Sequence, residues 1–141
     1  SLGLVGSEMC IRDRFSNSVA PAVIGASIEV FNMLRESNAL HDKLVENVNY
    51  FREKMTAAGF DIKPTQSAIC AVMLYDAKLS QIYAARMQEE GIYVTGFYYP
   101  VVPKDQARIR VQISAGHERK HLDKCIDAFI KVGKELGVLS R

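Results

Sequence analysis

Hydrophobic and polar residues recur with the spacing of an α-helix in four stretches of the chain. These stretches predict helices over about residues 19–35, 40–58, 79–90 and 118–137. Gly59 and Gly91 follow the second and third stretches, at positions where glycine commonly closes a helix. Pro21 falls in the first turn of the first helix, where its missing N–H does no harm.

The clearest strand pattern is a strict alternation over residues 107–114. Ala107, Ile109, Val111 and Ile113 point one way, and Arg108, Arg110, Gln112 and Ser114 point the other. The apolar run AICAVMLYD at 68–76 predicts a strand covered on both faces, and shorter strands are expected at 60–62 and 92–99. The order α-α-β-β-α-β-β-α predicts an α+β domain, a small sheet covered by helices.

Composition narrows the class of protein. The 141 residues suffice for one domain, and a net charge of +2 gives no argument for a nucleic-acid or membrane partner. No apolar run has the length of a membrane span. Three widely spaced cysteines form no disulfide or metal pattern, which favours a reducing cytoplasm. Cys70 and Cys125 fall on apolar faces and are predicted to be core residues.

The first fourteen residues, SLGLVGSEMCIRDR, differ from the rest of the chain. They show neither helical nor strand periodicity, and their positive charges follow the apolar residues, opposite to a signal peptide. They also resemble translated read-through of a sequencing adapter. We interpret 1–14 as a non-native or disordered segment, and 15–141 as the domain.

HERKH, residues 117–121, matches the H-E-x-x-H pattern of zinc proteases. It falls at the polar start of a helix, where the positive charges of Arg119 and Lys120 would repel a bound zinc ion. We therefore interpret it as a polar first turn in which Glu118 favours the helix dipole, and predict no metal site.

Two features could bind an anion. FSNS, residues 15–18, precedes a helix and is compatible either with plain capping or with a bound phosphate. Arg108 and Arg110 share the polar face of one strand. A guanidinium matches a carboxylate with two parallel hydrogen bonds, but a solvated strand face explains the pair equally well.

The segments FSNSVAPAVIGAS, YFREKMTAAGF, GIYVTGFYYPVVPK and QARIRVQISAGH resemble the C-terminal part of the α-oxoamine synthase family of pyridoxal-phosphate (PLP) enzymes. The likeness runs from residue 15 to about 138, and VTGFYYPVVPK is similar to the glycine C-acetyltransferases of that family. It implies the small C-terminal domain of the aspartate-aminotransferase fold. It also implies acetyl transfer from acetyl-CoA to glycine in threonine catabolism, with PLP as the electron sink.

The resemblance also implies roles for individual residues. Arg110 matches the arginine that holds the substrate carboxylate, and Ser16 and Asn17 match positions that reach the cofactor phosphate of the partner in a homodimer. Arg108 matches a basic residue without an assigned role. Asp105 stands where the family usually has glycine.

The family's Schiff-base lysine lies upstream of FSNS, and none of the nine lysines here has its context. We therefore expect no catalytic residue in this chain, and no activity from the chain alone. The alternatives are part of a sister enzyme such as 8-amino-7-oxononanoate synthase, or a non-catalytic interaction module of the same fold.

Overall fold

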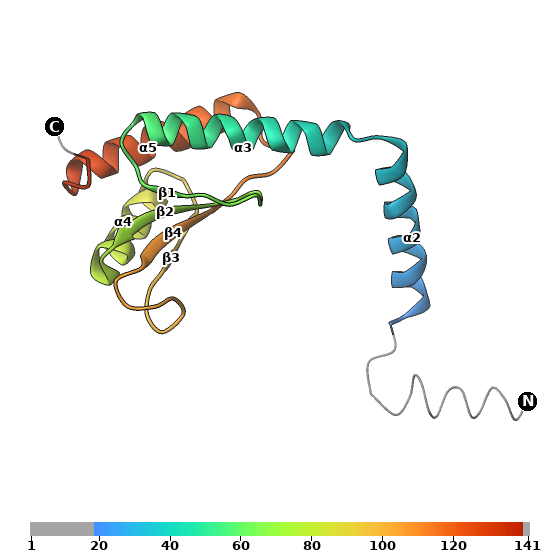
Figure 1. Cartoon of the computed structure of the whole chain (residues 1–141), viewed down its shortest axis with the longest axis horizontal. Helices are drawn as coiled ribbons and strands as arrows, with labels where there is room; N and C mark the ends of the chain where they lie inside the picture. Colours follow the sequence, from blue (N-terminus) through green and yellow to red (C-terminus); the bar gives the residue numbers. More distant parts are fainter. Residues whose placement is uncertain (1–18, 140–141) are drawn as a thin grey trace, which may run out of the picture. The chain divides into compact units, whose positions relative to one another are not determined.

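The computed structural model describes residues 19–139, so the segment 1–14 lies outside the described residues. Its elements follow the predicted order (Figure 1): α2 (Pro21–Glu36), α3 (Ala39–Ala57), β1 (Ile62–Lys63), β2 (Ile69–Tyr75), α4 (Ala77–Glu89), β3 (Thr95–Phe97), β4 (Ala107–Gln112) and α5 (Arg119–Glu135). The chain divides into two compact units, Ser1–Asn38 and Ala39–Arg141. None of the described helices is both long and apolar enough to cross a membrane.

Helix α2 is the described element of the first unit. Pro21 opens it as predicted, and Ala20 at the N-cap makes no side-chain capping bond. The predicted apolar residues are present on the helix, but within the described part of the chain none of its residues is buried. Its exposed apolar side chains include Val23, Ile28 and Phe31.

The second unit is built on a four-stranded antiparallel sheet in the order β1-β2-β4-β3. Ile109 of β4 stands opposite Val72 of β2 on one side and Gly96 of β3 on the other. Every residue from Cys70 to Leu74 is buried, which confirms the prediction of a strand covered on both faces.

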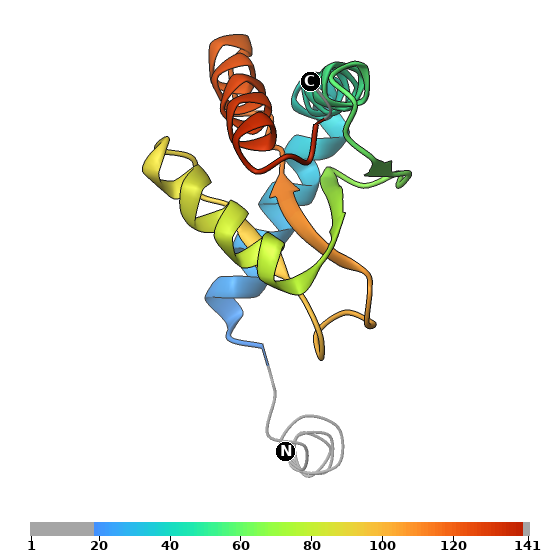
Figure 2. The same cartoon turned by 90° about the vertical axis from the view of Figure 1, so that its left-hand side faces the viewer.

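Helices α3 and α5 run side by side, as Figures 1 and 2 show, and α4 contacts strands β2, β3 and β4. Their buried side chains form one core with the inward residues of the sheet. Phe129 of α5 lies at its centre, with ring centroids 6.4 Å from Phe51, 5.9 Å from Phe60 and 5.6 Å from Tyr83. Cys70 and Cys125 are both buried in this core, as predicted.

Several predicted boundaries were wrong. The strand expected over 92–99 is limited to Thr95–Phe97, because the Ile92 N–H closes the end of α4 by bonding to the Met87 carbonyl at 2.9 Å. The strand expected over 60–62 is Ile62–Lys63. Helix α4 begins earlier than predicted because the Asp76 carboxylate accepts the Leu79 N–H at 2.7 Å.

Candidate functional site

The alternation along β4 places its two arginines on the face opposite the core. Ala107, Ile109 and Val111 are buried toward the helices, whereas Arg108 is half-buried and Arg110 is exposed. This confirms the predicted polar face. Arg110 is flanked in the sheet by Ala71 of β2 and Thr95 of β3.

The two arginines, equivalent in the sequence pattern, are bonded differently. The Arg108 Nε donates to the Gln106 carbonyl at 3.1 Å, and its Nη2 donates to the Gln106 side-chain oxygen at 3.3 Å. Within residues 19–139, Arg110 donates no hydrogen bond and forms no ion pair. Four of the five arginines between residues 39 and 139 have such partners, namely Arg52, Arg86, Arg108 and Arg119. Of these five, Arg110 is the one in which no guanidinium donor is bonded.

Arg110 borders a shallow hollow along the edge of the sheet. The guanidinium carbon lies 5.6 Å from the ring centroid of Phe97, on the neighbouring strand β3. The hollow is lined by Tyr93, Val94, Thr95, Phe97, Arg110 and Gln112. None of these residues carries a carboxylate, so an anion placed there would meet one positive charge and no lining negative charge.

The other predicted site residues, Ser16 and Asn17, lie outside the described residues. Their contact with the cofactor phosphate therefore stays a prediction.

The histidines of HERKH use their Nδ1 atoms to hold the turn before α5. The His117 Nδ1 accepts the Ser114 N–H at 3.2 Å, and the His121 Nδ1 accepts the Glu118 N–H at 3.1 Å. In each neutral ring the proton is then on Nε2, so zinc could bind there only after these bonds were broken. Across residues 19–139, no three His, Cys, Asp or Glu side chains gather in a way that could hold a metal ion.

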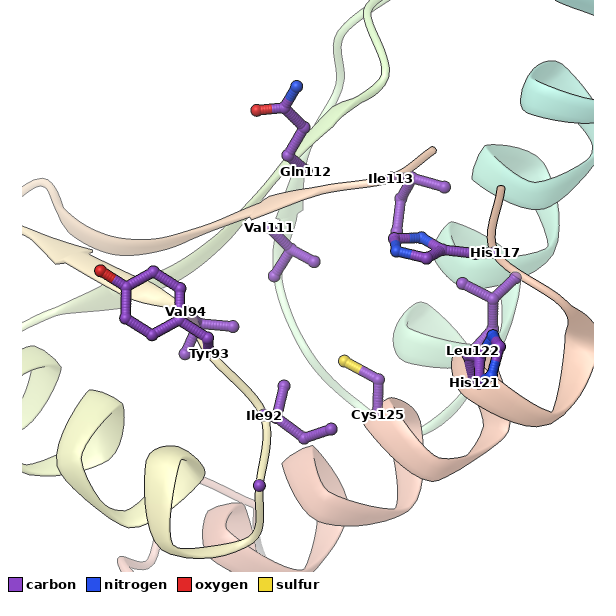
Figure 3. A pocket seen from close by; sticks show the side chains of 11 residues that line it. Ile92, Tyr93, Val94, Val111, Gln112, Ile113, His117, His121, Leu122 and Cys125 are labelled. Atoms are coloured by element: carbon purple, nitrogen blue, oxygen red, sulfur yellow. The ribbon is translucent and has the colours of Figure 1, made fainter. Parts of the chain in front are cut away.

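A cavity of about 320 Å³ lies beside these histidines, between β4, α5 and the segment after α4. Figure 3 shows the Cys125 sulfur directed into it, between Ile92 and Val111. Burial raises the pKa of the Cys125 thiol to about 12, so the thiol remains protonated and is a poor nucleophile. We assign the cavity no chemistry.

Near the N-terminal end of β4, two non-glycine residues, Tyr75 and Asp105, adopt a left-handed backbone conformation. Asp105 has φ 59°, a conformation that glycine adopts without cost and that other residues adopt less readily. Asp105 therefore adopts a backbone conformation that favours glycine. Tyr75 has φ 65°, beside the register shift between β2 and β4, and its hydroxyl donates to Asp61. Sequence reasoning missed Tyr75, because a tyrosine at the end of an apolar run predicts extended backbone and not a positive φ.

Comparisons with known proteins identify the family. The model of the family "Aminotransferase class I and II" matches residues 2–129. The 2-amino-3-ketobutyrate coenzyme A ligase of Salmonella typhimurium is 52% identical over 126 residues, which cover 89% of this chain and 32% of that protein. The 8-amino-7-oxononanoate synthase of Thermosipho melanesiensis is 45% identical over 125 residues, covering 89% of this chain and 32% of that protein.

A solved structure agrees with the sequence relatives. A serine palmitoyltransferase from S. paucimobilis, solved with a bound PLP–myriocin aldimine, superimposes with a TM-score of 0.81 and 25% identity, covering 89% of this chain and 32% of that one. The chain thus spans about a third of the length of the relatives that it matches. Because the family model matches well over half of its residues, the chain belongs to the class I and II aminotransferase family.

Proposed function

We propose that this chain is the C-terminal third of a PLP-dependent glycine C-acetyltransferase, which joins glycine and acetyl-CoA to give 2-amino-3-oxobutanoate and CoA. In this proposal Arg110 binds the carboxylate of glycine. The similarity to the 2-amino-3-ketobutyrate coenzyme A ligase supports the reaction, and the free guanidinium of Arg110 supports the role.

One observation carries the proposal: of two arginines on one strand face, the structure leaves the donors of Arg110 alone unpaired. A guanidinium presents N–H groups in a fork that fits a carboxylate with two parallel hydrogen bonds. The hollow beside Arg110 has no lining acid to compete with such a ligand. Arg110 can therefore fix the orientation of an amino acid by its carboxylate.

The described residues do not by themselves fit PLP. A lysine that forms a Schiff base is usually enclosed, and its pKa is lowered. All nine lysines are exposed, and the pKa of Lys131 is raised because its amine is hydrogen-bonded to Glu90. We assign the attachment of the cofactor to protein outside residues 19–139, and propose that the chain alone is inactive.

We further propose that the intact enzyme is a cytoplasmic homodimer, in which Ser16 and Asn17 of one subunit contact the cofactor phosphate in the other. This assignment rests on the resemblance of FSNS to the family segment and on the sparse cysteines.

The test is substitution of Arg110 in the full-length protein that carries this chain. Hydrogen bonds to a charged group contribute about 1.5–3 kcal/mol, so Arg110→Ala should lower kcat/KM for glycine roughly 10- to 150-fold. Arg110→Lys keeps the charge without the fork and should recover part of the loss. Steady-state kinetics at varied glycine concentration give kcat/KM for the parent and each variant. The absorbance of bound PLP checks that the cofactor stays in place.

Arg108→Gln is the matched control, because Arg108 occupies the same strand face but is bonded to Gln106. It should leave the KM for glycine within about twofold of the parent, the change that roughly 0.5 kcal/mol would cause. An unchanged glycine KM in Arg110→Ala would refute the assigned role of Arg110.

The second candidate is a sister synthase, favoured by the 45% identity to an 8-amino-7-oxononanoate synthase. A panel of amino acids and acyl-CoA thioesters separates the two. A higher kcat/KM for a partner pair other than glycine and acetyl-CoA would favour the sister enzyme.

A further inference from the structure

We propose that Phe97 is a positioning residue that holds the Arg110 guanidinium in place for a carboxylate ligand. The geometry of the pair stands by itself, whereas its catalytic meaning rests on the proposed function.

The register of the sheet brings the two side chains together. Thr95 of β3 stands opposite Arg110, and Phe97 stands opposite Arg108. Residues two apart on a strand point to the same face, so Phe97 lies diagonally across from Arg110 on the face away from the core. The guanidinium carbon lies 5.6 Å from the ring centroid, within the range of a cation–π contact.

The position of Phe97 is fixed through its neighbour Gly96. A Cβ atom at Gly96 would lie 2.8 Å from the Ser80 carbonyl oxygen of α4, so β3 is packed backbone to backbone against that helix. Ser80 is fully buried, which makes α4 a firm support. The β3 backbone that carries Phe97 is thereby supported by α4.

Packing in the hydrophobic core does not explain why position 97 is a phenylalanine. It is half-buried, and among the described residues it belongs neither to the hydrophobic core cluster nor to the side chains packed against that cluster. The one ring contact that the structure gives Phe97 is the one with Arg110. The ring therefore lies outside the core and close to the Arg110 charge.

This arrangement suits carboxylate binding. A free arginine side chain loses considerable conformational entropy when it is held in one geometry. The ring attracts the cation through its face, while the in-plane N–H groups stay available to a ligand. Phe97 thus orients Arg110 before the ligand arrives, without competing for its donors.

The structural test uses the 141-residue chain and the conservative pair Phe97→Leu and Phe97→Tyr. The ring face should move the Arg110 side-chain proton resonances upfield, and Arg110→Lys assigns those resonances. Phe97→Leu should abolish the upfield shift and Phe97→Tyr should keep it, with the backbone amide spectrum of β4 unchanged in both. An upfield shift that persists in Phe97→Leu overturns the proposal.

The functional test uses the full-length protein that carries this chain. Loss of an exposed cation–π contact should raise the KM for glycine about two- to fivefold with little change in kcat, and Phe97→Tyr should restore it. A merely structural role would instead lower the folded fraction in both variants. If Arg110→Ala impairs glycine use but Phe97→Leu does not, the positioning role is refuted while the proposed function stands. If Arg110→Ala has no effect, the proposed function fails, and the resonance shifts alone decide whether Phe97 holds Arg110.

Discussion

Helices α2 and α5 have nearly the same length but opposite surroundings. Of the 17 residues of α5, seven are buried, whereas none of the 16 residues of α2 is buried in the described part of the chain. Phe129 of α5 is fully buried, and Phe31 of α2 is 66% exposed. The apolar residues of α5 form one stripe, while those of α2 surround most of the helix.

The difference distinguishes a helix that packs into the core, α5, from a helix whose apolar side chains are exposed, α2. A helix that is apolar on most sides is typical of an enclosed position in a larger protein. A contiguous apolar surface of this kind is unusual on a monomeric protein and marks an interaction site. The uncovered surface of α2 is consistent with a chain that spans about a third of the length of its relatives.

The largest contrast should appear when the two phenylalanines are truncated. Phe129→Ala removes the ring that contacts Phe51, Phe60 and Tyr83, and should lower the free energy of unfolding by about 3–5 kcal/mol. Urea unfolding followed by tyrosine fluorescence of the 141-residue chain measures the loss.

Phe31→Ala makes the same chemical change in α2 and is the control. Because Phe31 is exposed, its truncation should change the free energy of unfolding by less than about 0.5 kcal/mol. Equal losses in the two variants would show that α2 is as closely packed as α5, and the contrast would be wrong.

Alkaline pH should destabilise the core and spare α2. Burial raises the pKa of Cys125 from its ordinary 9.0 to about 12, and burial also raises the pKa of Tyr83. The unfolded chain therefore loses these protons first, so stability present below pH 9 is lost as the pH rises toward 12. For Cys125 alone the loss approaches about 1.4 kcal/mol per pH unit once the unfolded thiol is ionised, and amounts to about 2 kcal/mol between pH 9 and 11.

Urea unfolding at several pH values checks this slope. Cys125→Ala lowers stability at pH 8 because it removes core volume, but it should flatten the decrease between pH 9 and 11. Helix α2 contains no Cys, Tyr or Lys, so the helical signal that survives core unfolding should not depend on pH in this range. If the free energy of unfolding decreases as steeply with pH in Cys125→Ala as in the parent, groups other than Cys125 cause the alkaline loss of stability.

Apolar spacing predicted the elements of both regions well, because helices and strands impose their periods on any sequence that folds around a core. Gly59 and Gly91 close helices with φ of 97° and 77°, as their positions predicted. The same spacing could not show that α2 is uncovered. The burial of an apolar helix face depends on which residues pack against it. Periodicity shows only that the helix has such a face.

The candidate site shows the same limit at the level of single residues. Arg108 has Gln106 two positions before it, and Arg110 has Gln112 two positions after it, so the sequence treats the pair alike. In the structure Gln106 takes the donors of Arg108, and Arg110 stays free. The strand face was predictable, but the choice between its two cations was not.

The smallest predicted effect contrasts one glycine in each region. Gly96→Ala places a Cβ 2.8 Å from the backbone oxygen of Ser80, which cannot rotate away, and should lower the free energy of unfolding by about 1–3 kcal/mol. Gly25 of α2 has nothing within 4 Å of an added Cβ, and alanine favours a helix over glycine by about 0.8–1.0 kcal/mol.

Gly25→Ala should therefore leave core unfolding unchanged and increase the helical circular dichroism of α2. The same substitution then has opposite signs in the two regions, because Gly96 is packed against α4 whereas an added Cβ at Gly25 meets nothing within 4 Å. A destabilised core in Gly25→Ala would show a close contact on α2. An undisturbed core in Gly96→Ala would remove the packed support that holds Phe97 beside Arg110.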